Sequence, residues 1–141
     1  MLIDNMLYTT YNNKGDNNSH MQIEVVFYET EDGKQPAKLF LRSLQDKKLK
    51  AKIYKTIELL ELQGIELREP YSKYLEEGIF ELRIKQGSNI SRVLYFFFIG
   101  NRAVLTNGLI KKTKKTPKQA IETAKKLKAD YERRYRNGKL S

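Results

Sequence analysis

Apolar side chains recur with two different periods along the chain, and these periods predict its elements. The β-branched and aromatic run Ile23–Glu29 predicts a strand. Apolar positions three or four residues apart then predict two helices, with Pro36 at the first position of one and Asp46 and Gly64 bounding the other. The apolar positions are Ala37, Phe40, Leu41 and Leu44 in the first helix, and Leu49, Ile53, Ile57 and Leu60 in the second. The two together predict a helical hairpin.

Three further strands follow the segment "REPYSKYLEEG", which is interpreted as a connection. They are predicted at Ile79–Lys85, Ile90–Ile99 and Arg102–Ile110. In the first, apolar and charged residues alternate, which predicts one buried and one charged face. The middle strand, "ISRVLYFFFI", is apolar on both faces and therefore central. Gly100-Asn101 predicts a two-residue hairpin turn after it.

The last element is a helix, and it completes the predicted fold. Thr116-Pro117-Lys118-Gln119 matches a capping box with proline at the first helical position. An apolar stripe of Ala120, Ile121, Ala124, Leu127, Tyr131 and Tyr135 follows. The fold class expected is α+β: a small antiparallel sheet with an N-terminal helical hairpin and a C-terminal helix.

Hairpin register brings two arginines together. A two-residue turn at Gly87-Ser88 pairs Arg83 directly with Arg92, and a turn at Gly100-Asn101 pairs Arg92 with Leu109. Lys111 then lies diagonal to Arg92 on the same face. Like charges directly opposite one another destabilise a sheet, so these side chains separate into solvent, bind an anion, or are neutralised by Glu81 and the Glu76-Glu77 pair. All three alternatives are open from register alone.

Length and composition place this sheet in one domain. The 141 residues are enough for a single core, and residues 21–141 are assigned to it, with 1–20 as a flexible extension and Met21 as an alternative start. The chain has no cysteine and one histidine, so thiolate chemistry and histidine metal clusters are not expected, and no cofactor is predicted. With no apolar run long enough for a membrane span, a cytoplasmic protein is expected.

Charge is concentrated at the C-terminal end. Residues 111–141 hold 12 basic and 3 acidic side chains, whereas residues 1–110 hold 15 and 14. Such a basic segment is typical of a surface that binds a polyanion. Lys111 and Lys112, at a strand end, are better placed for a site than Lys114 and Lys115, and a helix N-terminus beside them favours an anion.

Aromatic residues divide between core and surface. Phe80, Phe96, Phe97 and Phe98 are predicted to be buried by periodicity, and Tyr95 is expected to pack under a helix. Tyr71 and Tyr74 flank Lys73 in a polar segment. A ring there could stack on a nucleic-acid base.

Three of these segments together resemble a known family. "YSKYLEEGIFELRIK", "SRVLYFFF" and "LIKKTKKTPKQAIETAKKLKADY" are similar to the HigB-like branch, including phage-derived members, of the RelE/ParE toxin superfamily. The resemblance runs from about Ile23 to Tyr135. It implies the toxin of a type II toxin–antitoxin system, an endoribonuclease that cleaves mRNA and often does so on the ribosome. The partner implied is a helix-turn-helix (HigA-like) antitoxin.

The resemblance also implies site residues. The family's basic active-site positions fall on Arg83, Arg92, Lys111 and Lys112, and more loosely on Lys73. Some relatives use a histidine near the C-terminus, where this chain has none. The remaining candidates, assigned to RNA binding, are Lys114, Lys115, Lys118 and Tyr74.

The hypothesis is therefore metal-independent cleavage, in which the RNA 2′-hydroxyl attacks the adjacent phosphate. Arg83 and Arg92 would clamp the phosphate, and Lys111 or Lys112 first, then Lys73, would transfer protons, with Glu81 ranked behind them. Three alternatives are kept. These are a gyrase-inhibiting ParE-type toxin on the same scaffold, a non-catalytic nucleic-acid-binding module, and a purely structural role in which the basic helix docks an acidic partner.

Overall fold

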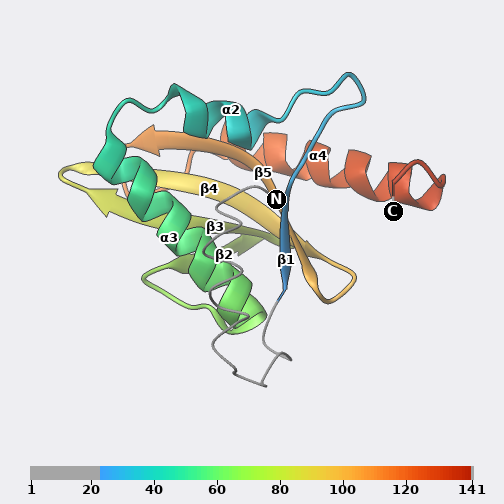
Figure 1. The fold of residues 1–141 in the computed structure, drawn as a ribbon, viewed down its shortest axis with the longest axis horizontal. Helices are drawn as coiled ribbons and strands as arrows, with labels where there is room; N and C mark the ends of the chain where they lie inside the picture. Colours follow the sequence, from blue (N-terminus) through green and yellow to red (C-terminus); the bar gives the residue numbers. More distant parts are fainter. Residues whose placement is uncertain (1–22, 141) are drawn as a thin grey trace.

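The computed structural model describes residues 23–140, which form a five-stranded sheet with helices on both faces (Figure 1). The predicted extension, residues 1–20, lies outside the described residues. The elements are β1 (Glu24–Phe27), α2 (Pro36–Ser43), α3 (Lys47–Gln63), a 3₁₀ turn (Gly64–Glu66), β2 (Ser72–Glu76), β3 (Ile79–Gln86), β4 (Asn89–Phe98), β5 (Arg102–Lys111) and α4 (Lys118–Arg136). The α+β prediction is confirmed. No helix among the described residues is long and apolar enough to cross a membrane.

The sheet has the strand order β1-β5-β4-β3-β2 and is mostly antiparallel. Two features differ from the prediction. β1 runs parallel to β5, and part of the predicted connection after Gly64 forms β2, which pairs with β3 at the sheet edge. β2 lacks the apolar alternation of the other strands, because as an edge strand it buries little beyond Ser72.

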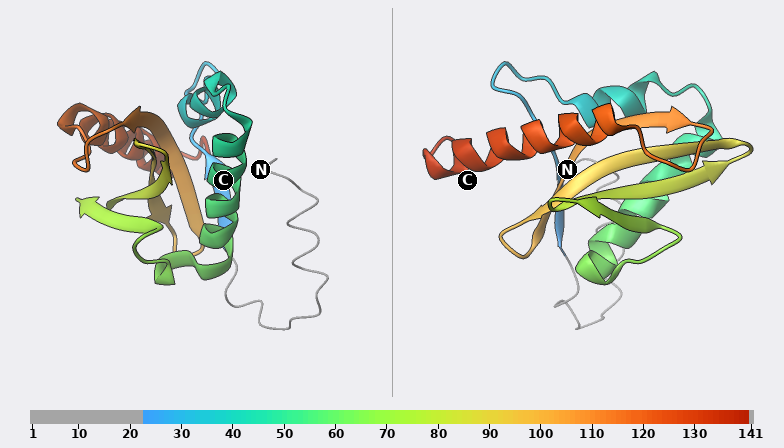
Figure 2. Two further views of the ribbon diagram at one scale, coloured as in Figure 1. Left: turned by 90° about the vertical axis from the view of Figure 1, so that its left-hand side faces the viewer. Right: turned by 180° about the vertical axis from the view of Figure 1, so that it is seen from behind.

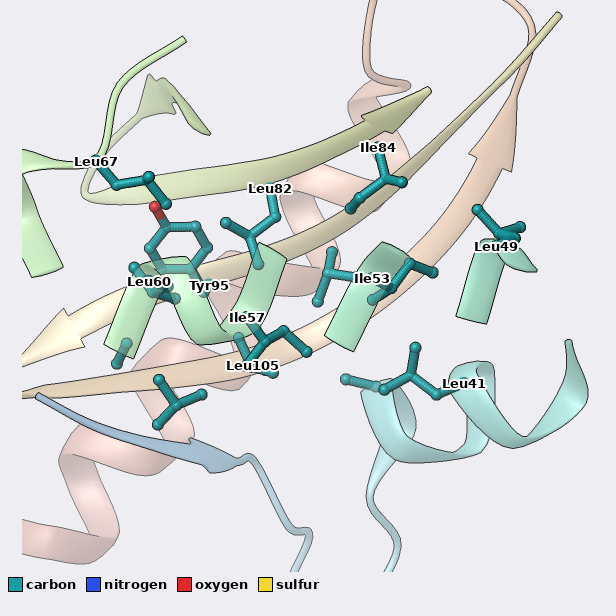
Figure 3. Packing of buried hydrophobic residues seen from close by; sticks show 14 residues of the cluster. Leu41, Leu49, Ile53, Ile57, Leu60, Leu67, Leu82, Ile84, Tyr95 and Leu105 are labelled. Atoms are coloured by element: carbon teal, nitrogen blue, oxygen red, sulfur yellow. The ribbon is translucent and has the colours of Figure 1, made fainter. Parts of the chain in front are cut away.

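The two helical layers lie on opposite faces of the sheet (Figure 2). On one face α2 and α3 cover Leu82, Val93, Tyr95 and Leu105, and Figure 3 shows Ile53 and Ile57 of α3 pointing into this cluster. On the other face α4 covers a smaller cluster around Leu94, Phe96 and Val104. Tyr95 packs under α3, as predicted, and its hydroxyl contacts Ser72.

The local helix signals in the hairpin are confirmed. The Asp46 carboxylate accepts hydrogen bonds from the amides of Lys48 (3.0 Å) and Leu49 (3.1 Å), and Gly64 ends α3. Pro36 begins α2. The capping box predicted for α4 is wrong: the helix begins at Lys118, Pro117 is its N-cap, and no side chain caps it. The Thr116 hydroxyl instead donates a hydrogen bond to Glu81 of β3.

A partly buried polar cluster fixes the far end of α4 to Tyr28, the residue that follows β1. The Tyr28 hydroxyl donates to Asp130 Oδ2 at 2.6 Å, and Arg134 Nε donates to the same oxygen at 2.8 Å. Burial, with the hydrogen bond to Asp130, raises the pKa of Tyr28 to about 12. The C-terminal part of the helix is therefore held in place.

Gly108 provides a test of how closely α2 packs on β5. A Cβ atom at this position would lie 2.3 Å from Phe40 Cδ2. The backbone conformation of Gly108 is one that other residues also adopt, so the close approach of Phe40 is what disfavours a side chain. We expect Gly108→Ala to lower the free energy of unfolding by about 1–3 kcal/mol, measured by chemical denaturation. The double variant Gly108→Ala/Phe40→Leu should recover part of that loss. An unchanged stability in the single variant would contradict this packing.

Candidate functional site

The predicted arginine register is confirmed. Arg83 pairs directly with Arg92 across β3 and β4, and Arg92 pairs with Leu109 across β4 and β5. Both arginines lie on the sheet face that α4 covers, because the neighbouring Leu94 and Leu109 belong to the cluster beneath that helix. The two guanidinium groups are therefore brought to one place on one face.

Glu81 lies between the two arginines and offsets one of their two positive charges. Its Oε2 is 3.3 Å from Arg83 Nη1, and its Oε1 is 3.5 Å from Arg92 Nε. The Glu81 side chain is completely buried. The alternative in which acidic side chains neutralise the pair is therefore borne out only in part, through Glu81. The acidic Glu76-Glu77 pair has a different role, since both carboxylates bind Lys125 of α4.

Arg92 is buried as fully as Glu81, and its guanidinium faces protein groups. Nη2 donates a hydrogen bond to the carbonyl of Thr113. Burial lowers the pKa of Arg92, Glu81 opposes this, and the charge of Arg83 adds to it. An arginine stays charged in proteins, so this is a buried cation paired with a buried anion. In this conformation Arg92 has no surface with which to clamp a substrate phosphate.

The segment 112–117, which we call the lysine loop, is tied to this buried cluster at three points. Besides the bond from Arg92 to Thr113, Arg83 Nη2 donates to the Lys114 carbonyl at 3.2 Å. The buried Thr116 hydroxyl donates to Glu81 Oε1. The loop therefore folds back beside β3 and β4 before α4 begins (Figure 2).

A cleft of about 210 Å³ opens between the lysine loop and β2. It brings together the basic side chains Lys73, Arg83, Lys114 and Lys115. The other lining residues are Tyr74, Leu75, Glu81, Thr116 and Ile121. Lys73 pairs with Glu81 across β2 and β3, which places it on the same face as the arginines. The exposed fraction of the Arg83 side chain is 17%, so of the two arginines only Arg83 is open to a ligand.

The N-terminus of α4 is close to this cleft, since Thr116 and Ile121 both line it. A helix N-terminus carries partial positive charge from its free amide groups. With no side chain capping this one, the helix adds to the positive field of the lysines and Arg83. The arrangement suits an anion of phosphate size.

The other predicted basic residues do not line the cleft. Lys111 ends β5 opposite Ile90 and is exposed, as are Lys112 and Lys118. The order of preference drawn from sequence, with Lys111 and Lys112 ahead of Lys73, Lys114 and Lys115, therefore differs from the geometry. Lys111, Lys112 and Lys118 remain exposed positive charges that do not line the cleft.

Tyr74 is fixed at the edge of the cleft with half of its surface exposed. Its hydroxyl accepts a hydrogen bond from the Gly78 amide at 3.1 Å. Its ring meets Phe80 edge-on, with centroids 5.1 Å apart. Phe80 packs against the cluster under α2 and α3, so the Tyr74 ring lies on the opposite face of β2 from Lys73, where its exposed side can stack on a planar group at the sheet edge.

Thr116 is the residue that sequence reasoning missed, because the Thr-Pro pair was assigned to a helix cap. Thr116→Val keeps the shape and removes the donor to the buried Glu81 carboxylate. We expect it to lower the free energy of unfolding by about 1–3 kcal/mol, because a buried acceptor loses its partner. Thermal and urea unfolding would measure this, and Thr113→Val, at an exposed loop position, is the matched control.

Comparison with known proteins adds a family to this geometry. Residues 40–129 match the family described as phage-derived protein Gp49-like (DUF891). The match covers more than half of the chain. The chain belongs to the Gp49-like family. This is a phage-derived family of RelE-type, toxin-like proteins. The matched segment includes the buried arginine cluster, the lysine loop and every residue that lines the cleft. No curated protein matches the chain.

Proposed function

We propose that this Gp49-like protein is a toxin of the HigB-like branch that cleaves messenger RNA. The observation that carries the proposal is the cleft in which Arg83, Lys73, Lys114 and Lys115 converge beside the N-terminus of α4. Family membership supports a toxin, and the cationic cleft supports a phosphate-containing substrate.

The chemistry follows from what RNA supplies. The 2′-hydroxyl attacks the adjacent phosphorus and forms a bond to it, while the bond to the 5′-oxygen breaks. The 2′-hydroxyl loses a proton, the 5′-oxygen gains one, and the products are a 2′,3′-cyclic phosphate and a 5′-hydroxyl. The protein must move those protons and stabilise the negative charge that develops on the phosphate oxygens.

We assign these roles according to position in the cleft. Arg83 stabilises the phosphate, because it is the partly exposed arginine and Glu81 Oε2 accepts no hydrogen bond from it in the described structure. Lys73 and Lys114, with Lys115 beside them, are the better candidates for proton transfer, since all three line the cleft. Arg92 is a positioning residue that holds the lysine loop. Lys111, Lys112 and Lys118 attract the RNA strand, and Tyr74 stacks on a base.

The test is cleavage of a defined RNA by the purified full chain, with and without ribosomes. We expect discrete cuts that persist in EDTA, leave 2′,3′-cyclic phosphate ends, and disappear when the nucleotide before a cut is a 2′-deoxynucleotide. Intact transcripts together with DNA damage signalling in induced cells would favour the gyrase-inhibiting alternative. Binding without any cleavage would favour the non-catalytic module.

The proposal includes two partners. One is the ribosome, on which the message is presented to the cleft. The other is a helix-turn-helix antitoxin encoded beside the protein, which holds it inactive. Co-expression with the neighbouring gene should restore growth, and copurification would identify the complex.

A further inference from the structure

A second and larger hollow lies away from the basic cleft. Its volume is about 640 Å³, and it opens between α3 and the part of β3, Arg83–Lys85, that lies beyond the pairing with β2. Its apolar lining includes Leu59 and Ile84, which are partly and fully buried, and Tyr71, whose exposed fraction is 46%. An exposed tyrosine beside an apolar floor is the kind of anchor that interfaces use.

Lysines surround this groove. Lys52, Lys55 and Lys85 all line it and all are exposed. None of its lining residues is acidic, and among the described residues these three lysines take part in no ion pair. Lys52 Nζ is bonded only at 3.4 Å to the Lys85 carbonyl. The groove therefore combines an apolar floor with an unneutralised basic rim.

We propose that this groove binds an acidic, amphipathic helix of a partner protein. The lining residues Ala51, Lys55 and Leu59 follow one another at intervals of four along α3, over about 12 Å at 1.5 Å per residue. A partner helix lying beside them could insert an apolar stripe into the floor and direct acidic side chains to the rim. A bare phosphate backbone would satisfy the lysines and leave the apolar floor uncovered, so a protein segment fits better than RNA.

Arg83 lines both this groove and the basic cleft. The Arg83 guanidinium lies on the α4 face, 3.3 Å from Glu81 and 3.2 Å from the Lys114 carbonyl, whereas the groove opens beside α3, so a helix seated there leaves the cleft uncovered. The proposal of the groove itself is independent of RNA cleavage, because its evidence is the apolar floor and the basic rim.

The experiment uses the isotopically labelled full chain and two designed helical peptides. Both peptides carry the same leucine stripe, which is flanked by glutamates in one and by lysines in the other. We expect the acidic peptide to shift the amide resonances of Ala51, Leu59 and Ile84 and the basic peptide to leave them unchanged. Lys52→Glu/Lys55→Glu should weaken binding of the acidic peptide about tenfold or more, and Tyr71→Ala should also weaken it.

Lys48→Glu is the matched control, since Lys48 is an exposed lysine of α3 that does not line the groove. The affinity of the Lys48→Glu variant for the acidic peptide should stay near that of the native chain. Equal binding of both peptides, or shifts that map elsewhere, would overturn the proposal. Oligo(A) RNA that shifts the groove resonances more strongly than the acidic peptide would assign the groove to nucleic acid instead.

Discussion

Arg83→Ala is expected to lower the rate of RNA cleavage by about 10²–10³-fold, the usual effect of removing one donor that stabilises a developing oxyanion. Arg83 is the arginine that lines the cleft, and it is held loosely, 3.3 Å from Glu81 and 3.2 Å from the Lys114 carbonyl. It can turn towards a phosphate without leaving a buried site. Single-turnover cleavage with saturating protein would measure the change.

Two variants make the Arg83 result specific. Arg42→Ala removes an exposed arginine from α2, away from the cleft, and should keep full cleavage activity. Arg83→Lys keeps the charge and loses the planar fork of donors, so its rate should fall between those of native protein and Arg83→Ala. Circular dichroism would establish that each variant is folded. A folded Arg83→Ala variant that cleaves at the native rate would remove Arg83 from the reaction.

The same measurement separates catalysis from simple attraction. If the cleft only binds phosphates, loss of Arg83 should resemble loss of any one lysine around it, with a small fall in affinity and a shallower salt dependence. If Arg83 acts in the transition state, the rate should fall far more than the affinity. Lys112→Ala, which removes an exposed charge of the lysine loop that does not line the cleft, is the natural comparison.

The fold was largely accessible from the sequence, because its helices and its central strands carry strong periodic signals. β2 was missed for a physical reason: an edge strand such as Ser72–Glu76 packs on one neighbour, needs no apolar face, and reads as a polar connection. The parallel pairing of β1 with β5 was also missed. Periodicity predicts that a strand exists and does not say which distant strand it pairs with.

The register around Arg92 was predicted correctly through two errors that cancel. Phe98 pairs with Arg102, so the loop between β4 and β5 has three residues and not two, with Ile99 and Gly100 at positive φ. A β-bulge between Val93 and Tyr95 then shifts the pairing back by one residue. A bulge has no clear sequence signal here, and without it the far half of the sheet would have a different register.

The site was only partly accessible for a related reason. Sequence parity placed Glu81, Arg83 and Arg92 on one face, and the structure agrees. The burial of Glu81 and Arg92 could not be predicted from the sequence. It depends on the lysine loop folding back over the strands and on the hydrogen bond from Thr116 to Glu81. That same fold-back brings Lys114 and Lys115 to the cleft and leaves Lys111 and Lys112 outside it.

Arg92→Met is expected to lower the free energy of unfolding by about 3–5 kcal/mol, because it leaves the buried carboxylate of Glu81 without one of its partners. Methionine approximates the length of the side chain and fills the space, so the loss reports the charge and the hydrogen bond to Thr113 more than a cavity. Urea unfolding monitored by circular dichroism would measure it.

Adding Glu81→Gln to Arg92→Met should recover a substantial part of that loss, because the buried anion is then removed together with its cation. The coupling between the two substitutions should exceed about 1 kcal/mol, as expected for residues in one buried network.

An unchanged stability of Arg92→Met would be equally informative. A variant Arg92→Met that unfolds like the native chain and yet cleaves no RNA would mean that Arg92 leaves its buried position and contacts the substrate. The exposed fraction of Arg92 is zero, so such a movement would require the lysine loop to open, since Thr113 and Thr116 close over the pair.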